Sequence, residues 1–383
     1  MSAAVDISIC GAGPVGMALA LMLLEQDMSA DRIVLIDGKT AAQASQDARS
    51  IALSFGSAQL LQALDAWPQT ATPIHQIHIS RRGYFGRTFI DRTDLDVPAL
   101  GYVTRYGDLV SVLAQRCTHT GISVRRPVSL LSASETAQDV ELVLKDEGMN
   151  QSKIRCEILV QAEGGLFAQQ TVKAKHRDYQ QTALVTHVKV SRPIVHRAFE
   201  RFTDEGPLAL LPQEDGYALV WCASPTTIDA LLLLPEAAFL QRLDDAFGAR
   251  LGRFTHTGVR GAYPLGLNAD PAASARIVAI GNAAQTLHPV AGQGLNLGLR
   301  DAAVLARRLA HNPSPTVLAQ FQASRTADRN STIWLTDLMA RAFISPAQGS
   351  FTQLLLGLSL GLADVLVPAK KQLAEQMMFG QRD

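Results

Sequence analysis

Cysteine is scarce in this sequence, and the few cysteines present are dispersed. Cys10, Cys117, Cys156 and Cys222 form no CxxC pair and have no histidine-rich neighbourhood. This spacing excludes a disulfide framework and a structural zinc site of the common kinds. We therefore expect a reducing, intracellular compartment and no bound metal.

Charge is also scarce, and it is balanced. Charged residues make up 18% of the 383 positions, whereas about 25% is typical of globular proteins. Lysine plus arginine number 35 and aspartate plus glutamate number 35, so the net charge is zero. No overall positive field attracts nucleic acid, and we expect none as a partner. With 47% apolar residues the chain can form a sizeable core, which excludes disorder as its main character.

Long apolar runs are missing as well. A transmembrane helix needs about 18 or more uncharged apolar residues, and the nearest approach, Leu354–Ala363, is shorter and ends at Asp364. Residues 1–9 carry no basic segment and include Asp6, which is untypical of a secretory signal. These absences predict a cytoplasmic protein.

The chain begins with the pattern of a strand, a tight loop and a helix. Val5–Cys10 is a β-branched run that stops at a glycine loop, and Met17–Glu25 consists of good helix formers. A second apolar run, Ile33–Ile36, ends at Asp37 and closes a βαβ unit. This order predicts a domain built on a parallel sheet.

The rest of the chain alternates between two kinds of pattern. Ile74–Ile90, Thr182–Val190 and Tyr217–Cys222 read as antiparallel strands of a second, β-rich domain. Between them, the helical segment Leu109–Cys117 and the buried strand Glu157–Ala162 return to the first domain. Further on, the pattern predicts a strand at 276–280, a helix at 295–309 and helices from 316 to the end, broken at Pro346 and Pro368. The two domains are therefore expected to be interleaved.

The first chemical motif is the loop Gly11-Ala12-Gly13-Pro14-Val15-Gly16 between the first strand and helix. In a GxGxxG loop the first glycine permits the turn, the second lets a pyrophosphate approach the backbone, and the third lets helix and strand pack closely. The start of the helix near Pro14 offers free N–H groups to the diphosphate. Asp37, at the end of the second strand, is expected to accept hydrogen bonds from an adenosine ribose. The alternative is a purely structural glycine turn.

A second glycine-rich loop, Gly281–Asn296, runs from a buried strand into a helix that begins near Gly294 or Leu295. Its helix start again presents unpaired N–H groups to a negative charge. An ordinary connection remains the alternative. Two further segments are weaker signals by themselves. The first is Asp47–Ser54, whose Arg49 would commonly be a solvated cation. The second is 162–165 (Ala-Glu-Gly-Gly), which shows only that a strand ends in a turn.

Together these four segments resemble the flavin-dependent aromatic hydroxylases of the para-hydroxybenzoate hydroxylase type. The likeness is greatest to the ubiquinone-biosynthesis hydroxylases, in particular the 2-octaprenyl-6-methoxyphenol hydroxylase branch. It covers nearly the whole chain, and its most specific part is HPVAGQGLNLGLRD at 288–301. A single dinucleotide-binding unit also fits, because this class binds FAD and has no separate nicotinamide domain.

The resemblance implies a set of FAD-binding positions. Those for the ADP half are Gly11, Gly13, Pro14, Val15, Gly16 and Asp37, with Arg49 near the diphosphate and ribityl chain. The resemblance also implies that Gly281 and Asn282 contact the ribityl chain and the diphosphate of FAD. Those bordering the isoalloxazine ring are Pro289, Gly292, Gln293, Gly294, Leu295 and Asn296. Pro289 is the candidate for the catalytic environment of flavin C4a, and the helix start would stabilise negative charge on reduced flavin.

The fold that the resemblance implies is of the α/β class. A Rossmann-like FAD-binding domain (1–73, 99–175 and 268–325) is interleaved with a β-rich substrate domain (74–98 and 176–267), and helices at 326–383 complete the chain. The implied reaction uses NAD(P)H to reduce FAD and O2 to form a C4a-hydroperoxyflavin, which hydroxylates the ring of a polyprenylated phenol in ubiquinone biosynthesis.

The implied partners are the prenylated phenol and other ubiquinone-biosynthesis proteins. A lipid substrate also raises the question of peripheral contact with the inner membrane, for which the leucine-rich segment Leu354–Leu366 is a candidate. A core or oligomer-interface helix is the alternative for that segment. His75 and His78, three apart on an expected strand, fall on opposite faces and are interpreted as structural.

The sequence departs from the family pattern at three positions. Asn282 and Glu163 stand where aspartate is usual, and Gln285 stands where histidine is usual. Asn282 loses one charge-assisted hydrogen bond to the ribityl chain. An arginine expected near position 107 has no clean match, although Arg105 and Tyr106 are close. Two other hypotheses therefore stay open, namely an assembly subunit with weak flavin binding and an FAD-dependent prenyl reductase.

Overall fold

The first sheet forms around the βαβ unit at the start of the chain. A computed structural model describes residues 4–83, 87–164, 173–269, 274–288, 292–310 and 313–342, together with 371, 375, 376 and 378–380. The strands of this sheet are β1 (Ala4–Cys10), β2 (Ile33–Ile36), β8 (Ser123–Arg125), β9 (Val128–Glu135), β10 (Val140–Asp146), β11 (Gln151–Gln161) and β18 (Ile277–Ala279). They run in the order β8-β2-β1-β11-β10-β9, with β18 also paired to β11. All pairs are parallel except those that join β9, β10 and β11, which confirms the expected parallel sheet.

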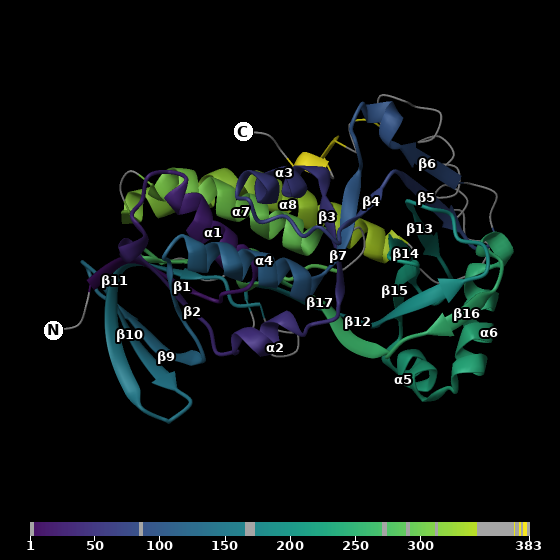
Figure 1. Cartoon of the computed structure of the whole chain (residues 1–383), viewed down its shortest axis with the longest axis horizontal. Coiled ribbons are helices and arrows are strands. Elements are labelled where there is room, and N and C mark those ends of the chain that lie inside the picture. Colours follow the sequence, from purple (N-terminus) through teal and green to yellow (C-terminus); the bar gives the residue numbers. More distant parts are fainter. Residues whose placement is uncertain are drawn as a thin grey trace.

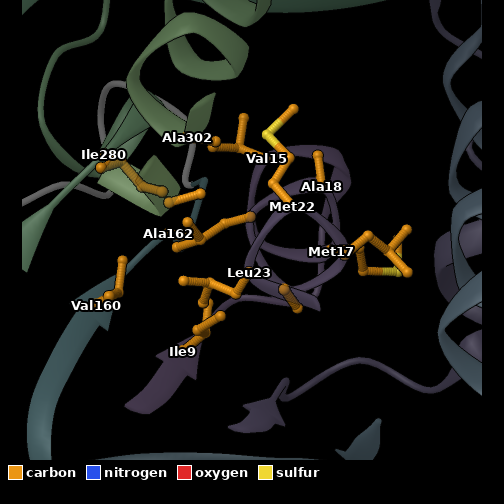
Figure 2. Packing of buried hydrophobic residues seen from close by; sticks show 14 of the residues in the cluster. Ile9, Val15, Met17, Ala18, Met22, Leu23, Val160, Ala162, Ile280 and Ala302 are labelled. Carbon is orange, nitrogen blue, oxygen red and sulfur yellow. The ribbon is translucent and has the colours of Figure 1, made fainter. Parts of the chain in front are cut away.

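Helices cover one face of this sheet. They are α1 (Pro14–Leu24), α4 (Tyr106–His119), α7 (Gln293–Leu309) and α8 (Pro315–Ala342), and α1, α7 and α8 lie side by side in Figure 1. Figure 2 shows Val15 and Met22 of α1 close to Ala302 of α7, with Ile9 of β1, Val160 of β11 and Ile280, which directly follows β18, nearby. Because α1 is apolar and buried around nearly its whole circumference, it holds the first glycine loop between sheet and helices.

The second sheet is mainly antiparallel. Its strands are β5 (Gln76–Arg81), β6 (Arg87–Asp91), β12 (Lys175–Val190), β13 (Arg197–Phe202), β14 (Pro207–Gln213), β15 (Gly216–Ala223), β16 (Phe254–Thr257) and β17 (Gly261–Ala269). Their order is β16-β12-β15-β14-β13-β5-β6, with β17 on β12, and only β13 and β5 are parallel neighbours. These strands confirm the antiparallel pattern predicted at 182–190 and 217–222.

The two faces of the second sheet have different neighbours. Helices α5 (Pro225–Leu233) and α6 (Glu236–Phe247) pack on one face, which we call the outer face, through a core that includes Phe239, Phe247 and Trp221 (Figure 1). The other face, which we call the inner face, meets a small sheet of β3 (Ser50–Ser54), β4 (Thr72–Ile74) and β7 (Gly101–Arg105). The remaining short elements are α2 (Ala41–Ser45), α3 (Phe55–Ala63), η1 (Ala30–Arg32), η2 (Arg92–Leu95), η4 (Ala249–Leu251) and η5 (Gly281–Ala283).

The fold class predicted from the sequence is confirmed, and the helix boundaries shift slightly. The first helix begins at Pro14, as expected, and the helix after the second glycine loop begins at Gln293, slightly earlier than expected. All four cysteines are buried and free. No helix in the described part of the chain is long and apolar enough to cross a membrane. The breaks expected at Pro346 and Pro368, and the segment Leu354–Leu366, lie outside the described residues.

Candidate flavin site

The first glycine loop is shaped by backbone contacts that exclude side chains. Gly11 has φ +106° and donates its N–H to the carbonyl of Ile36 at 2.7 Å. A Cβ atom on Gly11 would lie 2.6 Å from the backbone of Ala162, and one on Gly16 would overlap the carbonyl of Gly11. The first and third glycines of the motif are therefore required by the packing of β1, β11 and α1.

Gly13 differs from these two glycines. Its φ of −80° suits any residue, and the nearest atom to a Cβ placed on it is the hydroxyl oxygen of Tyr106, at 3.1 Å. The protein itself therefore leaves room beside Gly13, at the N-terminus of α1. Pro14 occupies the first turn, so the free N–H groups that follow it face this space. A group carrying negative charge, such as a diphosphate, fits there.

Asp37 and an arginine that the sequence did not single out flank the loop. The Asp37 carboxylate accepts the N–H groups of Ala12 and Lys39, each at 2.8 Å. Arg126, which directly follows β8, donates to the carbonyl of Ala12 and lies 3.7 Å from Asp37. The Nε atom of Arg126 is buried and has no hydrogen-bond partner among the described residues. The loop thus has a fixed carboxylate and a nearby cation with an unused donor.

Arg49 lies between two aromatic rings close to the same loop. Its guanidinium carbon is 5.2 Å from the ring centroid of Tyr106 and 5.6 Å from that of Tyr263. Asp47 accepts from Nε at 2.9 Å and from Nη2 at 2.6 Å. The hydrogen bond to Asp47 raises the pKa of Arg49 and keeps the side chain cationic. Since Tyr106 also borders Gly13, Arg49 is near the space that the glycine loop leaves open.

The second glycine loop meets the first through the packing of α1 on α7. Gly281 has φ +58°, and Cβ atoms placed on Gly281 and Gly298 would lie 3.3 and 2.8 Å from Val15. Asn282 lies next to two other glycines: a Cβ on Gly164 would be 3.9 Å from its side chain, and one on Gly294 would be 3.8 Å from its Oδ1 atom. These contacts bring together the two glycine loops and the turn that follows β11.

The start of α7 is held against β3 by Asn296. Its Oδ1 atom accepts the N–H of Ser54 at 2.8 Å, and its Nδ2 atom donates to the carbonyls of Gly292 and Ala52 at 2.8 and 3.2 Å. Gly292 has φ +60° and caps the helix. Gln293 is buried and Leu295 is half-buried in the first turn. Pro289, the predicted catalytic position, lies outside the described residues.

A buried ionic cluster anchors the far side of this loop. Asp301 is fully buried and accepts from Arg325 at 2.8 Å, from Arg329 at 3.0 Å and from the Gln285 side chain at 3.1 Å. Gln285, one of the departures from the family pattern, thus has a structural partner. The cluster ties α7 and the second glycine loop to α8.

The inner face of the second sheet is directed at these loops. His288 forms a hydrogen bond with Gln181 of β12 at 3.0 Å, and Ser50 of β3 donates to Gln213 of β14 at 2.6 Å. Tyr263 of β17 reaches Arg49 from the same face, because it pairs with Ala183. A molecule bound against this face would therefore lie next to the first and second glycine loops, which we call the flavin loops.

Glu200 is a charged residue on that inner face. It pairs with Ala209 of β14 and Ile79 of β5, and alternate residues of β14 lead from Ala209 to Gln213. Glu200 is half-buried, and burial raises the pKa of its carboxyl to about 7. Among the described residues, the carboxyl group of Glu200 has no hydrogen-bond or ion-pair partner. The geometry thus offers a carboxyl group that can exchange a proton near neutral pH.

His75 and His78 do not form a site together. His75 lies between β4 and β5 with its ring 4.4 Å from that of His196, whereas His78 points to the outer face and packs against Phe199. Sequence reasoning missed Arg126, Tyr263 and Glu200, since each stands outside any motif.

Comparison with known proteins agrees with the site. A family model described as an FAD binding domain matches residues 4–330. The chain belongs to this family of FAD-dependent monooxygenases. Relatives that are 30% identical include the ubiquinone hydroxylase of Rhodospirillum rubrum, over 88% of this chain and 81% of that protein, and 3-demethoxyubiquinol 3-hydroxylase of Escherichia coli K12, over 84% and 86%. The predicted family, and with it an FAD-dependent hydroxylase, is confirmed.

Solved structures share the fold of this monooxygenase. The p-nitrophenol 4-monooxygenase of Pseudomonas putida DLL-E4 superposes with a TM-score of 0.78 over 100% of both chains, at 16% identity. Anhydrotetracycline hydroxylase of Streptomyces rimosus gives 0.72 over 98% of this chain and 76% of that one, at 18% identity. The open space at Gly13 and the unused donor of Arg126 fit the FAD that the family binds.

Proposed function

We propose that this monooxygenase hydroxylates the aromatic ring of a polyprenylated phenol in ubiquinone biosynthesis, with NAD(P)H and O2 as co-substrates. The observation that carries the proposal is the carboxyl of Glu200, which lies on the inner face of the second sheet, the face that the second glycine loop contacts through His288. A phenol ring needs such a group nearby, because loss of the hydroxyl proton makes the ring more electron-rich. The names of the Rhodospirillum rubrum and Escherichia coli relatives support the pathway.

Bound FAD supplies the redox and oxygen-activating chemistry. The proposed role of Gly13 and the α1 N-terminus is to hold its diphosphate, with Asp37 at the adenosine ribose and Arg49 and Arg126 as neighbouring cations. In the second loop, Gly281 and Asn282 would contact the ribityl chain. The residues that would border the ring are Gly292, Gln293, Gly294, Leu295 and Asn296, together with Pro289.

Glu200 is the proposed proton acceptor for the substrate. Its ionised carboxylate oxygen would take the proton of the phenol hydroxyl, and burial places its pKa near 7, where both protonation states are populated at physiological pH. The neighbouring side chains on the inner face, Ala209, Val220 and Val185, are small or β-branched and apolar. They would contact the ring and exclude water around it.

The prenyl chain restricts how the substrate can reach the site. A long apolar chain has to enter from a membrane or a carrier protein, and we propose peripheral membrane contact for this reason. Other ubiquinone-biosynthesis proteins are the proposed macromolecular partners. We also retain the predicted division into an FAD-binding domain, a β-rich substrate domain and C-terminal helices as a proposal.

The purified protein gives a direct test. We expect a yellow protein with a flavin spectrum that oxidises NAD(P)H faster when a prenylated phenol is present. A colourless protein that takes up no added FAD would support a role in assembly. Bleaching of the flavin by NADPH without phenol-dependent oxygen use would point to a reductase.

A further inference from the structure

Five arginines gather on the outer face of the second sheet, at its β5–β6 edge. Arg82 directly follows β5, Arg87 begins β6, Arg197 and Arg201 lie on β13, and Arg250 lies in η4 after α6. We call these residues the arginine patch. They come from four separate segments of the chain, so the folding of the sheet and the end of α6 bring them together.

Strand register places the patch around a buried histidine. Phe199 pairs with His78, so Arg197 and Arg201, two residues to either side of Phe199, share its face. Arg87 pairs with Ser80 on the same face. His78 is only 6% exposed, and its buried Nδ1 atom has no hydrogen-bond partner among the described residues.

The charges of the patch are not neutralised by carboxylates. Arg197 donates to the Gln76 side chain at 2.6 and 2.8 Å, and Arg201 donates to the carbonyl of Ala246 at 3.2 Å. Both acceptors are uncharged. In the part of the chain that the structure describes, no carboxylate pairs with any of the five arginines. Asp91 shares this face, but it accepts from Gln76 at 2.7 Å and from Thr93.

Burial and the neighbouring arginines lower the pKa values of Arg250 and Arg201 in the patch and of the adjacent His78. Burial together with repulsion from Arg87 and Arg197 lowers the pKa of Arg250, and burial together with Arg250 and Arg82 lowers that of Arg201. Burial and then Arg250 lower the pKa of His78 to about 4, so His78 is neutral at pH 7. A surface with this much unpaired positive charge is destabilised unless an anion binds.

We propose that the arginine patch is a binding site for a phosphate group, separate from the flavin site. Guanidinium groups match the geometry and charge of phosphate oxygens through paired N–H donors. Arg197 and Arg201 are half-buried and held by neutral acceptors, which fixes two of the donors in place. Glu200 lies between Phe199 and Arg201 but faces the other way, so the sheet separates this site from the flavin loops.

Binding of pyrophosphate to the holoenzyme tests the proposal. Bound FAD occupies the glycine loop, so calorimetric titration with pyrophosphate reports other sites. We expect the double variant Arg87→Gln/Arg250→Gln, which changes two exposed arginines without hydrogen-bond partners among the described residues, to bind at least about tenfold more weakly. No binding to the parent protein, or equal binding to the variant, would overturn the proposal.

A matched control removes two cations elsewhere. In Lys153→Gln/Arg155→Gln both cations lie on β11 and are already paired, Lys153 with Glu141 at 2.7 Å and Arg155 with Asp139 at 3.8 Å. Pyrophosphate affinity should not change in this variant, and an equal loss would show only a general charge effect. In phosphate-free buffer the patch variant should unfold at no lower temperature than the parent. Earlier unfolding would assign the arginines a structural role and contradict the proposal.

Two further arms identify the source of the phosphate. If the patch variant raises KM for NADPH but not for NADH, the ligand is the 2′-phosphate of the nucleotide. If it loses co-sedimentation with phosphatidylglycerol vesicles, while phosphatidylcholine vesicles bind neither protein, the ligand is a lipid headgroup. A loss of pyrophosphate binding with neither effect assigns the site to a small phosphorylated molecule.

Discussion

The Nε2 atom of His288 lies 3.0 Å from the Oε1 atom of Gln181, and both residues are buried. This hydrogen bond joins the second glycine loop to the inner face of the second sheet. Tyr179 packs edge-on against His288 with ring centroids 5.3 Å apart. The contact fixes which face of the sheet the flavin loops meet, and Glu200 lies on that face.

Replacement of Glu200 by glutamine tests its proposed role in proton transfer. Because the pKa of Glu200 is about 7 and a base must be ionised, kcat/KM for the phenol should rise with pH up to about 7. Glu200→Gln should lower kcat about 100-fold and remove this limb of the pH profile. Glu200→Asp should retain it. A glutamine variant with the parent's pH profile would contradict the role.

Glu200→Gln should lower activity, but above neutral pH it should raise the stability of the protein. Burial raises the pKa of Glu200 from 4.5 in the unfolded chain to about 7, so the folded state binds the proton more tightly and loses stability as pH rises between these values. Glu200→Gln should therefore increase the free energy of unfolding at pH 8, by up to about 3 kcal/mol. At pH 4 the two proteins should differ little. Urea unfolding at both pH values measures this difference.

Gly13→Val tests the first glycine loop. The φ of Gly13 suits valine, and the only nearby atom is the Tyr106 hydroxyl, so the variant should fold. Its side chain should block the diphosphate, and FAD content after purification should fall at least about tenfold. Gly258→Val, at a glycine with no atom closer than 3.6 Å to a Cβ, is the control and should keep its flavin. Unchanged FAD content in Gly13→Val would disprove the assignment.

Asn282→Asp tests the departure from the family pattern. Asn282 lies beside Gly164 and Gly294, where the ribityl chain is proposed to bind. An aspartate would accept a charge-assisted hydrogen bond there and should strengthen FAD binding by about 1 kcal/mol, or about fivefold. Flavin fluorescence titration of the apoprotein measures the dissociation constant. Weaker binding in the variant would place the ribityl chain elsewhere.

Asp301→Asn tests the buried ionic cluster. Asp301 accepts from Arg325 and Arg329, and loss of its charge leaves Arg329 without an ion-pair partner among the described residues and buried Arg325 with Asp328 alone. The free energy of unfolding should fall by about 3–5 kcal/mol. Asp139→Asn, at a half-buried carboxylate that faces Arg155 across 3.8 Å, is the control and should cost less than about 1 kcal/mol. Similar losses in both would show that the cluster contributes little.

The glycine loops and Asp37 could be predicted from the sequence because their signals are local. The close packing of Gly16 on Gly11 and the hydrogen bond from Gly11 to Ile36 both lie within one βαβ unit, which the pattern of apolar runs already defines. The helix after the second loop follows in the same way from its own periodicity. Such features depend little on how distant segments pair.

The roles of Arg126, Glu200 and the arginine patch could not be predicted, because the pairing and register of the strands decide where these side chains lie. A one-residue slip of β13 would turn Glu200 to the outer face and Arg201 to the inner face. Arg126 reaches Ala12 only because β8 pairs with β2. Neither pairing leaves a signature in the residues themselves, since a single arginine or glutamate on a strand is common in any sheet.

The most direct test of the central claim is the fate of molecular oxygen. The purified protein, loaded with FAD and supplied with NADPH, a prenylated phenol and isotopically labelled O2, should produce a phenol that carries one labelled oxygen atom on its ring. Glu200→Gln should yield much less of this product, and Gly13→Val none. NADPH oxidation that yields hydrogen peroxide and leaves the phenol unlabelled would contradict the proposed function.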